Sequence, residues 1–141
     1  MTLYLIQSLI KCFPLNPLVS LLLGPISRNR FGQNERSIFT FLNSGEPSGL
    51  LHYLRNHDIQ KGNIYNLDNL YDYLQLNLEP SILVSNIGSQ WSEASEAVRR
   101  AEAIDNKQTN KLAKAIALID LFGKNLSLNA TKEVLFYTLP D

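Results

Sequence analysis

A segment rich in arginine holds the residues best suited to chemistry in this chain. It reads RNRFGQNER and carries three arginines from Arg28 to Arg36. Guanidinium groups present several N–H donors in one plane, which suits them to bind phosphate oxygens. The alternative is that these arginines form ion pairs with Glu35 and other acids. The residues alone leave both interpretations open.

The remaining reactive side chains favour structural roles. Cys12 is the single cysteine, so the chain can form no internal disulfide, and its apolar surroundings suggest a small buried side chain. His52 and His57 lie close to Asp58 but have no nucleophile beside them, and we interpret them as surface-helix residues. Neither histidine has cysteine partners at metal-binding spacing, so we predict no metal site.

The sequence contains no nucleotide-binding motif. It lacks the GxxxxGK[ST] and GxGxxG loops that bind phosphates, and it lacks an apolar run ending in paired acids that could hold Mg²⁺. We therefore expect no catalytic residues in the isolated chain. We also expect that the chain alone does not hydrolyse a nucleotide.

The composition suits one compact domain or one piece of a larger protein. The chain has 141 residues, of which 45% are hydrophobic and 18% are charged. Thirteen Lys and Arg balance thirteen Asp and Glu, so the formal net charge is zero. This balance argues against a strongly cationic nucleic-acid binder and against a highly charged disordered tail.

Helix signals dominate, and the predicted fold class is all-α, a helical bundle. The predicted helices cover residues 17–23, 33–42, 48–54, 67–78, 89–105, 107–123 and 129–139. Asn16 and Ser48 are expected to cap the helices that follow them. Gly24-Pro25 is expected to end or kink the helix before it, and Glu79-Pro80 is expected to end the helix before it.

Two amphipathic helices give the clearest pattern. Their apolar stripes consist of Trp91, Ala94, Val98, Ala101 and Ile104 in the first helix, and Leu112, Ala115, Ile116, Ile119 and Phe122 in the second. The connection between them is short, which predicts that they pack as antiparallel neighbours and form the main core. Lys107, Lys111 and Lys114 line one edge of the second helix and are expected to face solvent.

The start of the chain is unusually poor in charge. Residues 1–27 contain only Lys11, but polar residues and prolines break this stretch too often for a membrane span. We expect it to be buried against other protein, either a neighbouring domain that is missing or another subunit. The expected location is the cytoplasm, with no membrane association.

The segment NPLVSLLLGPISRNRFGQNERSIFTFL at residues 16–42 resembles a stretch of large bacterial P-loop ATPases of the AAA/STAND kind. The similarity continues through LNSGEPSGLLHYLRN, LYDYLQLNLEPSIL, WSEASEAVRRAEA and LAKAIALIDLFG. In that family this region follows the nucleotide-binding motifs. The resemblance implies that residues 1–45 hold an apolar segment and the end of the ATPase core. It implies that residues 46–141 form a helical, lid-like domain.

The resemblance also suggests roles for the arginine-rich segment. Arg36 is the candidate for a finger-type or sensing residue that faces the phosphates. Gln33 and Asn34 could orient Arg36 or a water molecule, and Glu35 could hold Arg36 when no nucleotide is bound. The phosphate-contact candidates are Arg28 and Arg30. ATP and Mg²⁺ would be cofactors of the parent ATPase, since this chain has no Walker motifs.

Our lead hypothesis is therefore a helical portion of a P-loop ATPase that covers or senses nucleotide and relays its state. Its partner would be the missing P-loop domain or another subunit, contacted through residues 1–27. The alternative is a non-catalytic helical binding module, in which a helix-turn-helix, winged-helix-like, at residues 107–139 contacts DNA or protein. Nucleic acid is the less favoured partner, since the last predicted helix offers only Lys132 as a cation.

Overall fold

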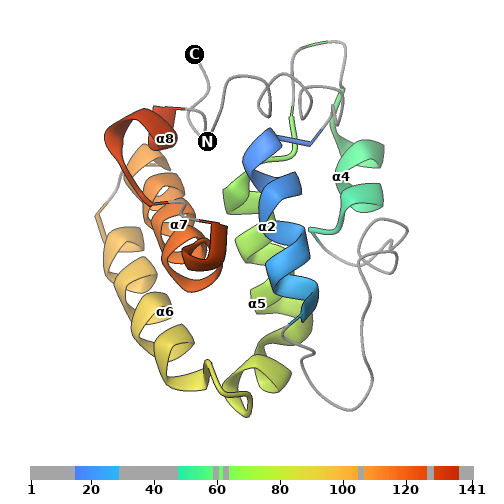
Figure 1. The fold of residues 1–141 in the computed structure, drawn as a ribbon. Helices are drawn as coiled ribbons and strands as arrows, with labels where there is room; N and C mark the ends of the chain where they lie inside the picture. Colours follow the sequence, from blue (N-terminus) through green and yellow to red (C-terminus); the bar gives the residue numbers. More distant parts are fainter. Residues whose placement is uncertain are drawn as a thin grey trace.

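The computed structural model describes residues 15–28, 48–58, 61, 64–104, 107–126 and 129–136, and they fold as a helical bundle. The elements are α2 (Pro17–Arg28), α4 (Leu50–Asn56), α5 (Leu67–Leu83), α6 (Gly88–Glu102), α7 (Lys107–Phe122), the 3₁₀ helix η2 (Lys124–Leu126) and α8 (Lys132–Phe136). In Figure 1, α2 and α5 lie side by side, with α6 and α7 to one side and α4 to the other. The predicted all-α class is confirmed for the described residues.

Asparagines tie together the amino ends of α2 and α5. Asn16 caps α2 as predicted, since its Oδ1 accepts a hydrogen bond from a backbone N–H of the first turn at 2.8 Å. Asn66 caps α5 in a reciprocal pair with Asn69. Asn16 Nδ2 donates to Asn66 Oδ1 at 3.2 Å, next to a backbone bridge between Leu15 and Tyr65. The two helices therefore start together and run in the same direction (Figure 1).

Two helices continue through prolines, so the helix end predicted at Pro80 is wrong, and of the end or kink predicted at Pro25 the end does not occur. In α2, both Pro25 and Ile26 are buried, so core packing stabilises the last turn. In α5, Ile82 is fully buried beyond the proline. The missing N–H of Pro80 deprives the carbonyl of Leu76 of a partner, and Leu76 lies at the surface, where water can replace it. Tertiary burial outweighs the local preference in both helices.

The cap predicted at Ser48 is also wrong. Helix α4 begins one residue later than expected, with Gly49 at the cap position and no side-chain cap. Ser48 adopts a positive φ of 66°. Its backbone is held on both sides, since the Tyr65 hydroxyl donates to its carbonyl and its N–H donates to His52 Nδ1 at 3.3 Å. The Tyr65 hydroxyl and the His52 ring therefore hold this turn, whereas the Ser48 side chain does not cap the helix.

The core lies where α5, α6 and α7 meet. Trp91 of α6 stacks on Tyr71 of α5, with ring centroids 5.2 Å apart. Helices α6 and α7 pack side by side along their length, which confirms the predicted pair (Figure 1). Helix α2 adds its buried face to the same core, against α5 and α7. Its apolar residues therefore have partners within this chain, whereas residues 1–14 lie outside the described residues.

Ile116 is not a core residue, contrary to the prediction from the apolar stripe. It is 37% exposed, whereas its neighbours on either side are buried. The buried face of α7 consists of Ala115, Ala117, Leu118, Ile119 and Phe122. The predicted stripe differs slightly from this buried face because α7 packs against α2 and α5 as well as α6. These contacts decide which face of α7 is buried. In α6, Ile104 follows the helix end and is 59% exposed, so it is not a core residue either.

The C-terminal part is helical, but a helix-turn-helix remains a prediction. Helix α8 begins at Lys132, later than the predicted cap at Asn129, and Thr131 Oγ1 accepts from the Val134 N–H at 3.3 Å. Residues beyond Phe136 lie outside the described part. The proposed boundary near residue 45 also stays a prediction. Within the described ranges, no helix is both long and apolar enough to cross a membrane.

Candidate functional site

The arginine-rich segment is described only at its first residue. Arg28 is exposed at the carboxyl end of α2. The other candidates for nucleotide sensing and phosphate contact lie outside the described residues; these are Arg30, Gln33, Asn34, Glu35 and Arg36. Their roles therefore remain predictions, as does that of Cys12.

The two histidines are engaged in local structure. His52 Nδ1 accepts the Ser48 N–H described above. His57 stacks on Tyr53 with ring centroids 4.0 Å apart, and its Nδ1 lies 3.1 Å from the Tyr53 carbonyl oxygen. Both histidines are exposed, in accord with the surface interpretation. Across the described ranges, no three His, Cys, Asp or Glu side chains come together as a possible metal site.

A partly buried ion pair links α5 to α7. Lys114 Nζ lies 2.7 Å from Asp72 Oδ1, and the lysine side chain is only 11% exposed. Lys114 was expected to face solvent, and this prediction is wrong. Its ammonium also lies 5.8 Å from the centroid of the Tyr71 ring. Burial raises the pKa of Asp72 by more than the hydrogen bond from Lys114 lowers it.

The buried tyrosines are kept neutral by their surroundings. Burial, assisted by the carboxylate of Glu79, raises the pKa of Tyr71 to about 12. Burial also raises the pKa of Tyr65, with a smaller effect from Asp72. A phenol that resists ionisation in this way is unsuited to act as a base near neutral pH. We therefore assign these tyrosines to the core.

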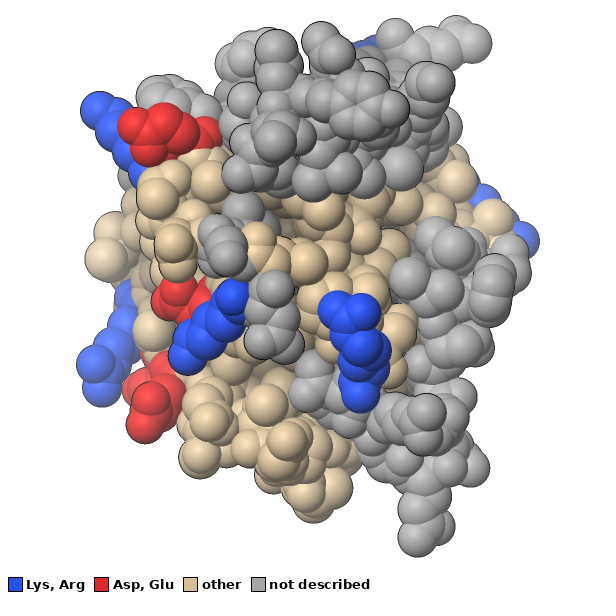
Figure 2. Space-filling view, in the orientation of Figure 1, with Lys and Arg blue, Asp and Glu red and all other residues tan. Residues whose placement is uncertain are grey.

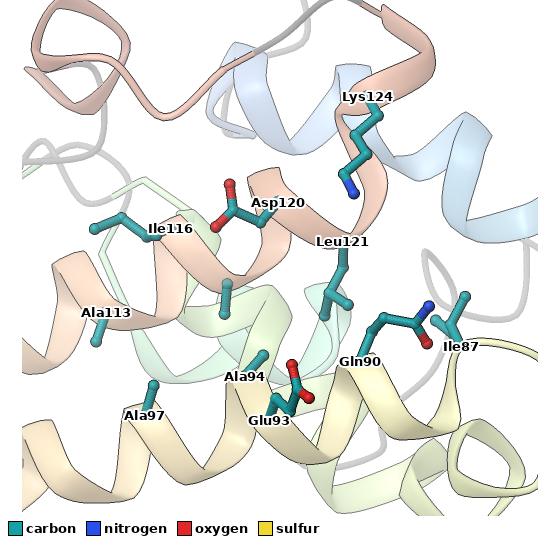
Figure 3. Close-up of a pocket in the computed structure, with 11 residues that line it drawn as sticks. Ile87, Gln90, Glu93, Ala94, Ala97, Ala113, Ile116, Asp120, Leu121 and Lys124 are labelled. Carbon is teal, nitrogen blue, oxygen red and sulfur yellow. The ribbon is translucent and has the colours of Figure 1, made fainter.

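A groove runs between α6 and α7 on the side of the pair away from α5. Its volume is about 660 Å³. The lining residues are Ile87, Gln90, Glu93, Ala94 and Ala97 from α6 and the turn before it, and Ala113, Ile116, Ala117, Asp120, Leu121 and Lys124 from α7 and η2. Figure 3 shows them along the two neighbouring helices, with Ala97 and Ala113 across from each other and with the Asp120 carboxylate directed away from α6.

Small side chains open this groove. Ala97 of α6 lies across from Ala113 of α7, and Ala94 and Ala117 also line the groove, so the two helices approach closely but leave a furrow above the contact. Trp91 of α6 faces α5, and Glu93 follows it by two residues, or about 200° around the helix. The same two helices therefore bury one face in the core and expose the opposite face as a groove.

The charged residues of the groove are mainly acidic. Glu93 on α6 and Asp120 on α7 stand on opposite walls, and both are exposed. Neither carboxylate forms an ion pair with a residue of the described part. Lys124 lies at the end of the groove near Leu121. On the face of the molecule drawn in Figure 2, Lys and Arg occur as separate groups, and only those in the left part of the view lie next to acids.

The sequence contains a signal for this groove that is separate from the apolar stripes. Alanine recurs at residues 94, 97, 113 and 117, which is the spacing of one face on each of two helices. The apolar stripes place Ala94 in the core and give no role to Glu93 or Asp120. No family model, curated protein or solved structure shows a significant match to this chain.

Proposed function

We propose that this chain is a non-catalytic helical module that binds a protein partner in the groove between α6 and α7. The observation that supports the proposal is the groove itself, with a floor of alanines and with Ile116 and Leu121 beside it. Its two exposed carboxylates have no ion-pair partner among the described residues. An apolar floor bordered by a few polar groups is typical of grooves that accept a helix.

The charge distribution favours a protein partner over DNA. Binding to the phosphate backbone needs several Lys or Arg on one surface. The net charge of this chain is zero, and the groove carries more acids than bases. DNA binding by a helix-turn-helix at residues 107–139 is therefore the less favoured form of the binding-module hypothesis.

Site-specific photo-cross-linking in cells that make the protein tests this proposal. A photoreactive residue at Ala97, which is exposed in the groove, should capture a partner protein. The same residue at Ser92, exposed on α6 but outside the groove lining, is the matched control. Ala97→Trp, which fills the groove, should abolish binding of the captured protein once it is purified. Equal capture at Ser92, or capture of nucleic acid alone, would contradict the proposal.

A second candidate is the lid of a P-loop ATPase, suggested by the sequence resemblance. Arg28 favours it, since this first residue of the arginine-rich segment is exposed. If the chain belongs to such an ATPase, Arg36→Ala in the full-length protein should lower ATP turnover and leave the unfolding midpoint almost unchanged. An unfolding midpoint that falls as strongly as the turnover would instead indicate an architectural arginine.

A further inference from the structure

We infer that the partner that binds between α6 and α7 is an amphipathic helix whose apolar face carries Lys or Arg on both flanks. This inference rests on the proposed function and adds the chemistry of the occupant. It is carried by the position of the two acids, one on each wall of the groove, above an uncharged floor (Figure 3).

The shape of the groove indicates a helix as the occupant. Two antiparallel helices with small facing residues leave a furrow parallel to their axes, and a third helix packs in such a furrow at interaxial distances of about 8–10 Å. From Gln90 to Ala97 the lining spans eight residues of α6, which are seven steps of 1.5 Å, or about 10 Å. That length accommodates about two turns of a partner helix. Ile87, Ile116 and Leu121 can contact its apolar side chains.

The charges indicate the sign of the flanks. A helix lying in the groove directs its flanking residues toward the two walls, as the residues beside the apolar seam do in a coiled coil. Glu93 meets one flank and Asp120 meets the other. Both carboxylates lack ion-pair partners within the described residues, so a cation on each flank would give each of them one. Acidic flanks would place like charges opposite each other.

The acids elsewhere on the same helix do not offer an equivalent site. Glu96 is one turn from Glu93, but it pairs with Arg99 and Arg100 on its own helix. Glu96→Lys is therefore the control: it changes the net charge of α6 as much as Glu93→Lys does, which is half of the change in the Glu93→Lys/Asp120→Lys double variant. Glu96 lies outside the groove lining.

Two synthetic peptides test the inference with the full chain. Both peptides have about three heptads with Ala and Leu on the apolar face, one with Lys and one with Glu on both flanks. We expect the Lys peptide to bind and to shift the backbone resonances of the groove residues in spectra of the isotope-labelled chain. The Glu93→Lys/Asp120→Lys double variant should weaken this binding by at least about tenfold and should bind the Glu peptide instead. Glu96→Lys should leave the affinity close to that of the unmodified chain.

The outcomes separate the inference from the proposed function. Equal binding of both peptides, no binding of either, or equal losses from Glu96→Lys and the double variant would each overturn the cationic helix. A partner cross-linked at Ala97 whose contact segment is acidic would also overturn it, but the proposed function would stand. Glu93, Glu96 and Asp120 are all exposed, so the double variant and Glu96→Lys should both fold, and circular dichroism checks this. Glu93→Gln/Asp120→Asn, which removes the charges without reversing them, should weaken Lys-peptide binding to a smaller extent.

Discussion

Replacement of Lys114 by methionine tests how the α5–α7 contact is stabilised. Methionine keeps most of the length and the apolar stem of lysine, so the change removes chiefly the charge. Loss of one partner from a fully buried ion pair costs about 3–5 kcal/mol. The side chain of Asp72 remains 32% exposed, so water compensates part of this loss. We therefore expect Lys114→Met to lower the free energy of unfolding by about 1–3 kcal/mol at pH 7.

The effect of this substitution should depend on pH. In the native chain, burial already raises the pKa of Asp72, and Lys114 opposes that rise. Without Lys114, the pKa of Asp72 in the folded state rises further above its unfolded value of about 3.9. An acid with a raised folded pKa destabilises the fold when it is ionised, so this cost is fully present above the folded pKa. It disappears as the pH falls toward the unfolded pKa. The variant should therefore differ most from the unmodified chain at neutral pH and least near pH 4.

Urea unfolding at a series of pH values measures this difference. Lys107→Met is the control, since Lys107 is exposed on the same helix, and it should change stability by less than about 0.5 kcal/mol. Adding Asp72→Asn to Lys114→Met should restore much of the loss at pH 7, because no buried charge is then left unpaired. A loss of equal size at pH 4 and pH 7 would show that packing, and not charge, is responsible.

Three further predictions follow from the core, the α5–α6 turn and the missing motifs. Leu118→Ala should cost about 2–5 kcal/mol in a urea titration, whereas Ile116→Ala should cost less than about 1 kcal/mol; equal losses would mean that the buried face of α7 is assigned wrongly. Gly88→Ala should lower the thermal unfolding midpoint, because a Cβ there would overlap the carbonyl oxygen of Leu83; an unchanged midpoint would refute that close approach. The isolated chain should show no heat of binding with Mg-ATP in titration calorimetry, and micromolar affinity would contradict the absence of a phosphate-binding loop.

The periodicity of apolar residues predicted the helices whose buried face follows the helical repeat. In α5, Leu67, Leu70, Tyr71 and Leu74 follow the helical repeat and are all buried. Helices α6 and α7 were also predicted as a packed pair. The predictions failed where one local signal competed with tertiary contacts. A proline is a strong local breaker, yet Ile26 and Ile82 are buried beyond Pro25 and Pro80 and stabilise the continued helix.

The groove was harder to predict than the helices, for a geometric reason. An alanine at Ala94 or Ala117 is compatible with a tightly packed core and with the floor of a furrow, and periodicity does not separate the two. The distinction depends on the rotation of α7 about its axis, which its contacts with α2 and α5 determine. The predicted apolar stripe of α7 is rotated slightly from the buried face and includes Ile116, which is exposed. With this rotation, the exposed groove face that carries Asp120 could not be predicted.

The core and the groove lie on opposite faces of α6 and α7, so substitutions can change binding and stability separately. Trp91 and Leu118 are fully buried on one side, whereas Glu93 and Asp120 are exposed on the other. Changing the exposed carboxylates removes no buried contact, so their loss should alter the partner's affinity at nearly constant stability. Truncating Leu118 should lower stability and leave the charge on the groove walls unchanged. If the α6–α7 face is the binding surface, the two sets of variants should therefore differ in which property they change.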